Sequence, residues 1–73
     1  NIMTNIFYLY DNKKLIKSFS QLNNVVKYIG TDLGGKNYEI YVEEYNNDID
    51  SNAIKTLLYK NNVFQIENIF NYY

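Results

Sequence analysis

The chain contains no cysteine, histidine, tryptophan, proline or arginine, and these absences exclude several kinds of chemistry. Without cysteine no disulfide can form, and without cysteine or histidine there can be no thiolate or imidazole metal site. Apolar packing must therefore hold the fold together. With 73 residues the chain forms one domain with a small core, so we expect partner binding or self-association to add noticeably to its stability.

Long apolar runs and a secretory leader are also missing. The longest apolar run, residues 6–10, is far shorter than the roughly 20 residues that span a membrane. No basic stretch followed by an apolar core opens the chain. We therefore expect no membrane association and a location in the cytoplasm of a bacterial host cell. We interpret Asn1 and Ile2, which precede a methionine, as a cloning scar, and expect residues 3–73 to form the natural single domain.

The residues that are abundant indicate an origin. Asn, Ile, Tyr and Lys make up 38 of the 73 residues, and A/T-rich codons encode all four. This composition indicates an AT-rich genome. Together with the short length it favours an accessory protein of a bacteriophage or mobile element, with a small host protein as the alternative.

The first half of the chain predicts a hairpin followed by a helix. Residues 6–10 form a β-branched and aromatic strand, residues 11–14 a turn, and residues 15–19 the returning strand. Both faces of the first strand are apolar, so we expect it to be central or covered on both sides. A helix follows, with Ser20 as N-cap and Gly30 as the left-handed residue that ends it. Its apolar stripe consists of Leu22, Val25, Val26 and Ile29.

The second half alternates and then becomes ambiguous. Residues 38–45 place Tyr38, Ile40 and Val42 on one face of a half-exposed strand. A second helix is predicted to begin at Asp50 or Ser51 and to carry Ile54, Leu57 and Leu58 inward, until Asn61 and Asn62 interrupt it. Residues 63–73 fit a strand or a helix, and we favour a strand to about residue 69. The predicted fold is α+β, in the order β-β-α-β-α-β, with a mainly antiparallel sheet and two helices on one face.

Two motifs resemble ligand-binding loops but lack essential members. Residues 30–36 match the first seven positions of a phosphate-binding P-loop, but Asn37 replaces the Ser or Thr that holds magnesium, and a helix precedes the loop where a strand should. Asp48, Asp50 and Asn52 alternate as in a calcium loop, but Ala53 and Tyr59 occupy the positions of its glycine and its bidentate glutamate. The carboxylates of Glu39, Glu43 and Glu44 lack a base or metal partner for acid–base chemistry. We therefore expect neither enzyme activity nor a cofactor or metal.

Charge is distributed unevenly along the chain. Residues 1–36 carry five lysines and two acids, and residues 37–73 carry two lysines and six acids, so the halves have charges of +3 and -4. A small nucleic-acid-binding regulator is therefore an alternative function, although the absence of arginine removes the side chain that grips phosphate most firmly. The lysines that would bind nucleic acid are Lys13, Lys14, Lys17 and Lys27.

One stretch resembles a known structural unit. Residues 8–30 combine a turn, a basic strand that ends in Phe19, a Ser20 cap and an apolar helix that ends in Gly30. This order resembles the hairpin-then-helix start of the small DNA-binding repeats of phage and intron homing nucleases. An acidic strand follows where that repeat has a recognition helix. The resemblance therefore implies a local hairpin–helix structure.

Aromatic residues outnumber what a small core can enclose. The chain has 9 Tyr and 4 Phe, so several rings must lie at the surface, where tyrosine is enriched at binding hot spots. AT-rich codon usage is the alternative explanation for the tyrosines. The leading hypothesis is a non-enzymatic protein that binds and inhibits a host protein, such as a nucleic-acid-binding immune effector; anti-CRISPR proteins are similar in size and composition. A homodimer paired through a strand edge is a third interpretation. The predicted acidic-aromatic contact surface consists of Glu39, Tyr41, Glu43, Glu44, Tyr45, Asp48 and Asp50.

Overall fold

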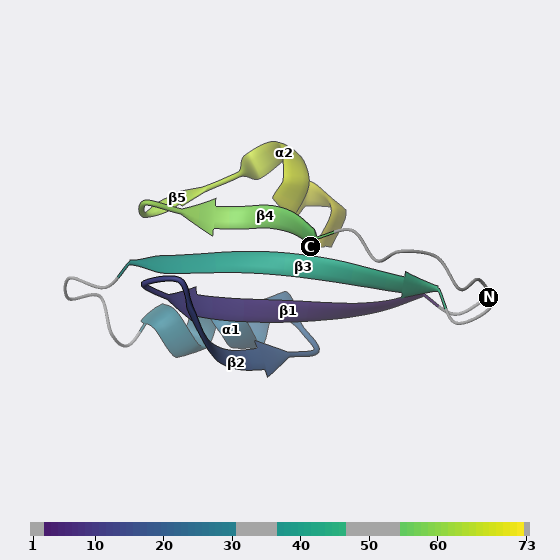
Figure 1. Cartoon of the computed structure of the whole chain (residues 1–73). Coiled ribbons are helices and arrows are strands. Elements are labelled where there is room, and N and C mark those ends of the chain that lie inside the picture. The colour runs from purple at the N-terminus through teal and green to yellow at the C-terminus, as the bar shows by residue number, and fades with distance from the viewer. Residues whose placement is uncertain (1–2, 31–36, 47–54, 73) are drawn as a thin grey trace.

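The structure, a computed structural model, describes residues 3–30, 37–46 and 55–72 and confirms the predicted α+β class (Figure 1). The two helices accompany one antiparallel sheet. The elements in chain order are β1 (Met3–Asp11), β2 (Lys14–Phe19), α1 (Leu22–Gly30), β3 (Tyr38–Asn46), β4 (Lys55–Lys60), β5 (Val63–Phe64), α2 (Ile66–Ile69) and the 3-10 helix η1 (Phe70–Tyr72).

The five strands form one sheet in the order β2-β1-β3-β4-β5, and every neighbouring pair is antiparallel. The long strands β1 and β3 lie in the centre, where Phe7 pairs with Val42 and Leu9 pairs with Ile40 (Figure 1). The prediction that the first strand is central is confirmed. Its apolar residues on alternating sides therefore supply two faces of the sheet.

Two tight turns with the same backbone conformation join the edge strands β2 and β5 to their neighbours β1 and β4. Asn12 and Lys13 have φ values of 53° and 67°, and Asn61 and Asn62 have φ values of 53° and 64°. Positive φ at both central residues is the mark of a two-residue type I′ hairpin, whose twist matches that of the flanking strands. Asparagine tolerates this conformation well. The predicted turn at residues 11–14 is therefore confirmed.

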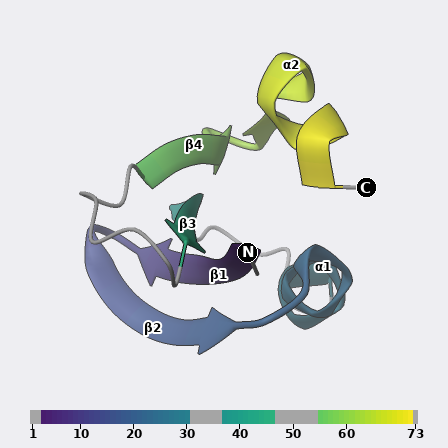
Figure 2. The same ribbon diagram turned by 90° about the vertical axis from the view of Figure 1, so that its right-hand side faces the viewer.

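Both helices lie on the same side of the sheet, as predicted, and we call this side the inner face (Figure 2). The strands contribute the fully buried side chains of Leu9, Ile40, Val42 and Leu58. Buried residues of the two helices complete the core: Leu22, Val25 and Ile29 come from α1, and Ile69 comes from α2. The predicted helical stripe is thus buried at three of its four positions, and Val26 packs partly against the same core.

The ends of α1 differ from the prediction in detail. The helix begins at Leu22, and the Asn24 amide donates to the Gln21 carbonyl at 3.2 Å, so Gln21 occupies the capping position instead of Ser20. Gly30 is the last helical residue, but its φ is not in the left-handed region. The sequence pattern therefore located the helix to within one residue but assigned the wrong capping residues.

The predicted second helix is wrong, because the segment Lys55–Lys60 is strand β4. Leu58 is buried as expected, whereas Leu57 pairs with Tyr41 on the other face and is only half-buried. The predicted cap at Asp50 or Ser51, and Ile54, lie outside the described residues. Asn61 and Asn62 do not interrupt a helix but turn the chain by means of their positive φ values, so that β5 can pair with β4.

The predicted final strand is also wrong beyond its first two residues. β5 contains only Val63 and Phe64, and the helical alternative holds from Ile66 onward. The Gln65 amide donates to the Leu58 carbonyl at 2.8 Å, and this bond ends the strand pairing. Within the described ranges, neither helix has the length and apolar character that crossing a membrane requires.

Candidate binding surface

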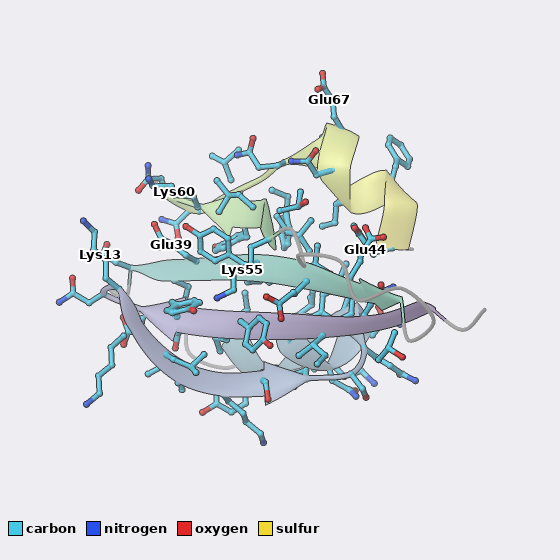
Figure 3. All side chains as sticks on the ribbon, turned by 45° about the vertical axis from the view of Figure 1, so that its right-hand side comes forward. Lys13, Glu39, Glu44, Lys55, Lys60 and Glu67 are labelled. Carbon is cyan, nitrogen blue, oxygen red and sulfur yellow. The ribbon has the colours of Figure 1, made fainter. Side chains whose placement is uncertain are left out.

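The opposite side of the sheet, which we call the outer face, is covered by no described helix (Figures 2 and 3). The strand register aligns its side chains in rows: Tyr8 lies opposite Tyr41, and Tyr10 lies opposite Glu39. On β4, Lys55 lies opposite Glu43, and Lys60 lies opposite Glu39. On β1, β3 and β4 the outer face consists of Ile6, Tyr8, Tyr10, Glu39, Tyr41, Glu43, Lys55, Leu57 and Lys60. β2 adds Leu15 and Ser18, which lie opposite Tyr10 and Tyr8.

One polar cluster crosses the three strands β1, β3 and β4. The Tyr8 hydroxyl donates to Glu43 Oε1 at 3.0 Å, and Glu43 is only 9% exposed. The Lys55 ammonium lies 5.0 Å from the centre of the Tyr8 ring, where the negative face of the ring attracts the cation. The Glu43 carboxylate is thus positioned by the Tyr8 hydroxyl and lies near the positive charge of Lys55, so it contributes to the fold as well as to the surface.

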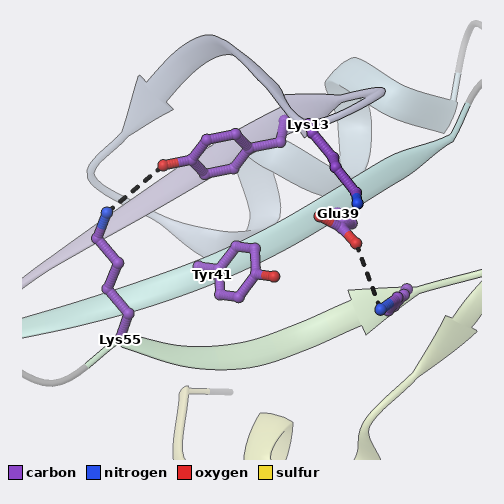
Figure 4. Close-up of a pocket in the computed structure, with 6 residues that line it drawn as sticks. Lys13, Glu39, Tyr41 and Lys55 are labelled. Carbon is purple, nitrogen blue, oxygen red and sulfur yellow. Dashed lines mark hydrogen bonds and ion pairs between the residues drawn. The ribbon is translucent and has the colours of Figure 1, made fainter.

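A shallow hollow of about 360 Å³ lies beside this cluster (Figure 4). The rings of Tyr10 and Tyr41 meet edge to face, with their centres 5.6 Å apart. The Lys55 ammonium donates to the Tyr10 hydroxyl at 3.4 Å, and this bond raises the pKa of Lys55, assisted by the negative charge of Glu43. The residues that line the hollow are Tyr10, Lys13, Glu39, Tyr41, Lys55 and Lys60.

The structure brings together only part of the predicted acidic-aromatic surface. Glu39, Tyr41 and Glu43 share the outer face. Glu44 lies on the inner side, where its carboxylate accepts a hydrogen bond from the Tyr72 hydroxyl (Figure 3). The backbone of Tyr45 continues β3, but its side chain is not described, and Asp48 and Asp50 lie outside the described residues.

Lysines alter the charge of the outer face relative to the prediction. Lys60 forms an ion pair with Glu39 at 3.7 Å, and Lys13 and Lys55 reach the same hollow. Among the described residues of this face, three ammonium groups accompany the two carboxylates of Glu39 and Glu43. The surface is therefore mixed in charge. Because β4 was predicted to be a helix, the sequence pattern gave no reason to place Lys55 and Lys60 opposite β3.

The four lysines of the alternative prediction do not share one side of the sheet. Lys13 lies at the outer hollow. The Lys17 ammonium lies 5.3 Å from the Phe19 ring and 5.6 Å from the Tyr28 ring of α1, which packs on the inner side. Lys14 begins β2, and Lys27 is exposed on α1. The lysine hairpin is therefore divided between the two sides.

Tyr8, Tyr10, Lys55 and Lys60 belong to the surface but were not among the predicted contact residues. Tyr8 and Tyr10 alternate with the buried Phe7 and Leu9, so the period of two in β1 was a usable signal. No such signal existed for the two lysines, because their position depends on the pairing of β4 with β3.

Within the described ranges, no group of three or more Asp or Glu side chains is arranged to hold a metal ion. Comparison with known proteins finds no matching family model, no matching curated protein and no matching solved structure. The candidate surface is thus assigned from its own residues and geometry.

Proposed function

We propose that this protein is a non-enzymatic interaction protein that binds and inhibits a host protein through the outer face. The observation that carries the proposal is the uneven covering of the sheet. Both helices pack on the inner face, while Tyr8, Tyr10 and Tyr41 lie half-exposed on a face without a covering helix. Half-exposed tyrosines offer a large contact area with few rotatable bonds, and they are enriched where proteins bind one another.

The charges of the outer face indicate the chemistry of the partner. The mixed charges of Glu39, Lys13 and Lys55 around the two rings favour a partner surface that also carries both signs of charge. The acidic-aromatic surface predicted from the sequence would instead favour a basic site on the partner. We propose a phage or mobile-element origin and an immune effector as the target, on the grounds of short length and an AT-rich composition.

The test compares two faces of the molecule with matched variants. Tyr41→Ala and Lys13→Glu change the outer hollow, and Tyr28→Ala removes an exposed tyrosine from α1 as the control. A photoreactive phenylalanine at position 10 of the full chain should crosslink a host protein, whose activity the purified chain then inhibits. We expect the two outer variants to weaken that inhibition at least about tenfold, the loss typical of one hot-spot residue.

Circular dichroism and melting establish that each variant is folded before it is compared. Equal inhibition by Tyr41→Ala, Lys13→Glu and the unmodified chain contradicts the outer face as the contact surface. Loss of inhibition in Tyr28→Ala alone would assign the contact to α1, where Lys17 lies beside Tyr28, instead of the outer face.

A further inference from the structure

The two edges of the sheet differ in length and exposure. β5, at one edge, has only two residues and leads directly into α2. β2, at the other edge, has six residues, and among the described strands only β1 pairs with it. A strand at the edge of a sheet presents a row of backbone N–H and C=O groups to solvent, which can pair with another extended chain.

β2 exposes apolar side chains as well as backbone. Leu15 is 49% exposed and Ile16 is 43% exposed, and the five residues from Lys14 to Ser18 are all exposed. Ile16 is the additional residue of a bulge, because Leu9 pairs with Lys17 and Tyr10 pairs with Leu15. These two neighbouring apolar side chains offer contacts for apolar residues of an added strand, and such side-chain contacts give specificity when a peptide extends a sheet.

The charge of this edge selects among the possible occupants. The turn and strand from residue 12 to residue 19 contain Lys13, Lys14 and Lys17 and no acidic residue, and Asp11 of β1 lies opposite Lys14. The edge therefore carries an excess of positive charge. A second copy of β2 would bring the same lysines to the same edge, and like charges on neighbouring strands are destabilising. An extended segment with acidic residues would instead place opposite charges beside them.

We propose that the exposed edge of β2 binds an extended acidic peptide segment of a partner protein by adding it to the sheet as an outer strand. The backbone of the segment pairs with β2, its apolar residues cover Leu15 and Ile16, and its carboxylates lie near Lys14 and Lys17. Leu15 lies opposite Tyr10, so this site adjoins the outer face, but it uses the backbone edge of β2 with Lys14 and Lys17, none of which lines the outer hollow. Variants at Lys14 and Lys17 therefore test it apart from the proposed function.

The test titrates the isotopically labelled full chain with a short blocked peptide that alternates glutamate and valine, and with a control peptide that alternates lysine and valine. We expect the acidic peptide alone to shift the amide signals of Lys14–Phe19 and to slow their hydrogen exchange. The double variant Lys14→Glu/Lys17→Glu should bind the acidic peptide at least about tenfold more weakly and should now bind the lysine peptide. Lys27→Glu, on α1, is the matched control and should leave the binding of the acidic peptide unchanged.

Three outcomes overturn the proposal. The first is that neither peptide shifts the β2 amides. The second is that a single-stranded oligonucleotide shifts them at concentrations where the acidic peptide does not, with binding that weakens steeply with salt, which assigns the lysines to nucleic acid. The third is that light scattering shows a dimer whose β2 amides are already protected, which assigns the edge to a second copy. Melting of the double variant establishes that lost binding does not reflect lost folding.

Discussion

On β3, Ile40 and Val42 are completely buried, whereas Glu39 and Tyr41, which alternate with them, remain partly exposed. The same backbone therefore serves two faces with different surroundings. The inner face is covered by α1 and α2, and its buried side chains form the hydrophobic core. The outer face combines tyrosine rings with charges and is covered by no described helix. Alternation along a strand thus identifies both the core and the candidate contact surface of a small sheet.

The largest expected effect tests the inner face. Ile40→Ala should lower the free energy of unfolding by about 2–5 kcal/mol, because it leaves a cavity in a completely buried position. Tyr41→Ala, one position away on the outer face, should cost less, because solvent can fill the space. Urea denaturation measures both. A greater loss of stability in Tyr41→Ala would show that the outer face is packed like a second core.

The next effect concerns the polar cluster on the outer face. Tyr8→Phe should destabilise the fold by about 1–3 kcal/mol, because it removes a donor from the nearly buried carboxylate of Glu43. Glu43→Gln should make the loss from Tyr8→Phe smaller, since a neutral amide needs the donor less. A double-mutant cycle in urea measures this coupling. Strictly additive losses would show that Tyr8 and Glu43 do not act as a pair.

A smaller effect is expected on the inner side, where the polar pair of Tyr72 and Glu44 lies at the margin of the core. Burial and the hydrogen bond to Glu44 raise the pKa of Tyr72 to about 12. The unfolded chain therefore loses this proton first, and the stabilisation is complete below pH 10 and is lost as the pH rises towards 12. Tyr72→Phe should cost about 0.5–1.5 kcal/mol near neutral pH.

Urea titrations at several alkaline pH values provide the measurement for Tyr72. The difference in stability between the unmodified chain and Tyr72→Phe should shrink as the pH rises above 10. A difference that stays constant up to pH 12 would contradict the raised pKa.

The smallest effect is expected for the ion pair of the outer hollow. Lys60→Gln removes the partner of Glu39, but Lys60 is 49% exposed, so solvent and salt weaken the attraction. The free energy of unfolding should change by no more than about 1 kcal/mol, and less at high salt. A larger, salt-independent loss would contradict this expectation and show that the ion pair is an important source of folding stability.

Local patterns predicted most of the fold as far as β3. The hairpin of β1 and β2, the buried stripe of α1 and the alternation of β3 all follow from the spacing of apolar residues. The structure after β3 depends on long-range pairing. Leu57 and Leu58 fit a helix by their spacing, yet β4 pairs along β3, and Asn61 and Asn62 supply the turn that this pairing needs. Tertiary pairing here overrides a short local pattern.

The residues of the candidate surface were also predicted only in part. Glu39, Tyr41 and Glu43 were placed together correctly because they lie on one strand. Glu44 was included although consecutive strand residues point to opposite faces, and the structure indeed places it on the inner side with Tyr72. The lysines of β4 required knowledge of a neighbouring strand, and they convert an expected acidic patch into a mixed one.

The unequal edges of the sheet have a consequence for stoichiometry. The proposed strand addition would use β2, because the two residues of β5 are too short to template a ladder. Each molecule would then accept one such partner at β2, and the described β5 edge would not pass the pairing on. Such an addition would end after a single strand, unlike the open-ended pairing of a fibre.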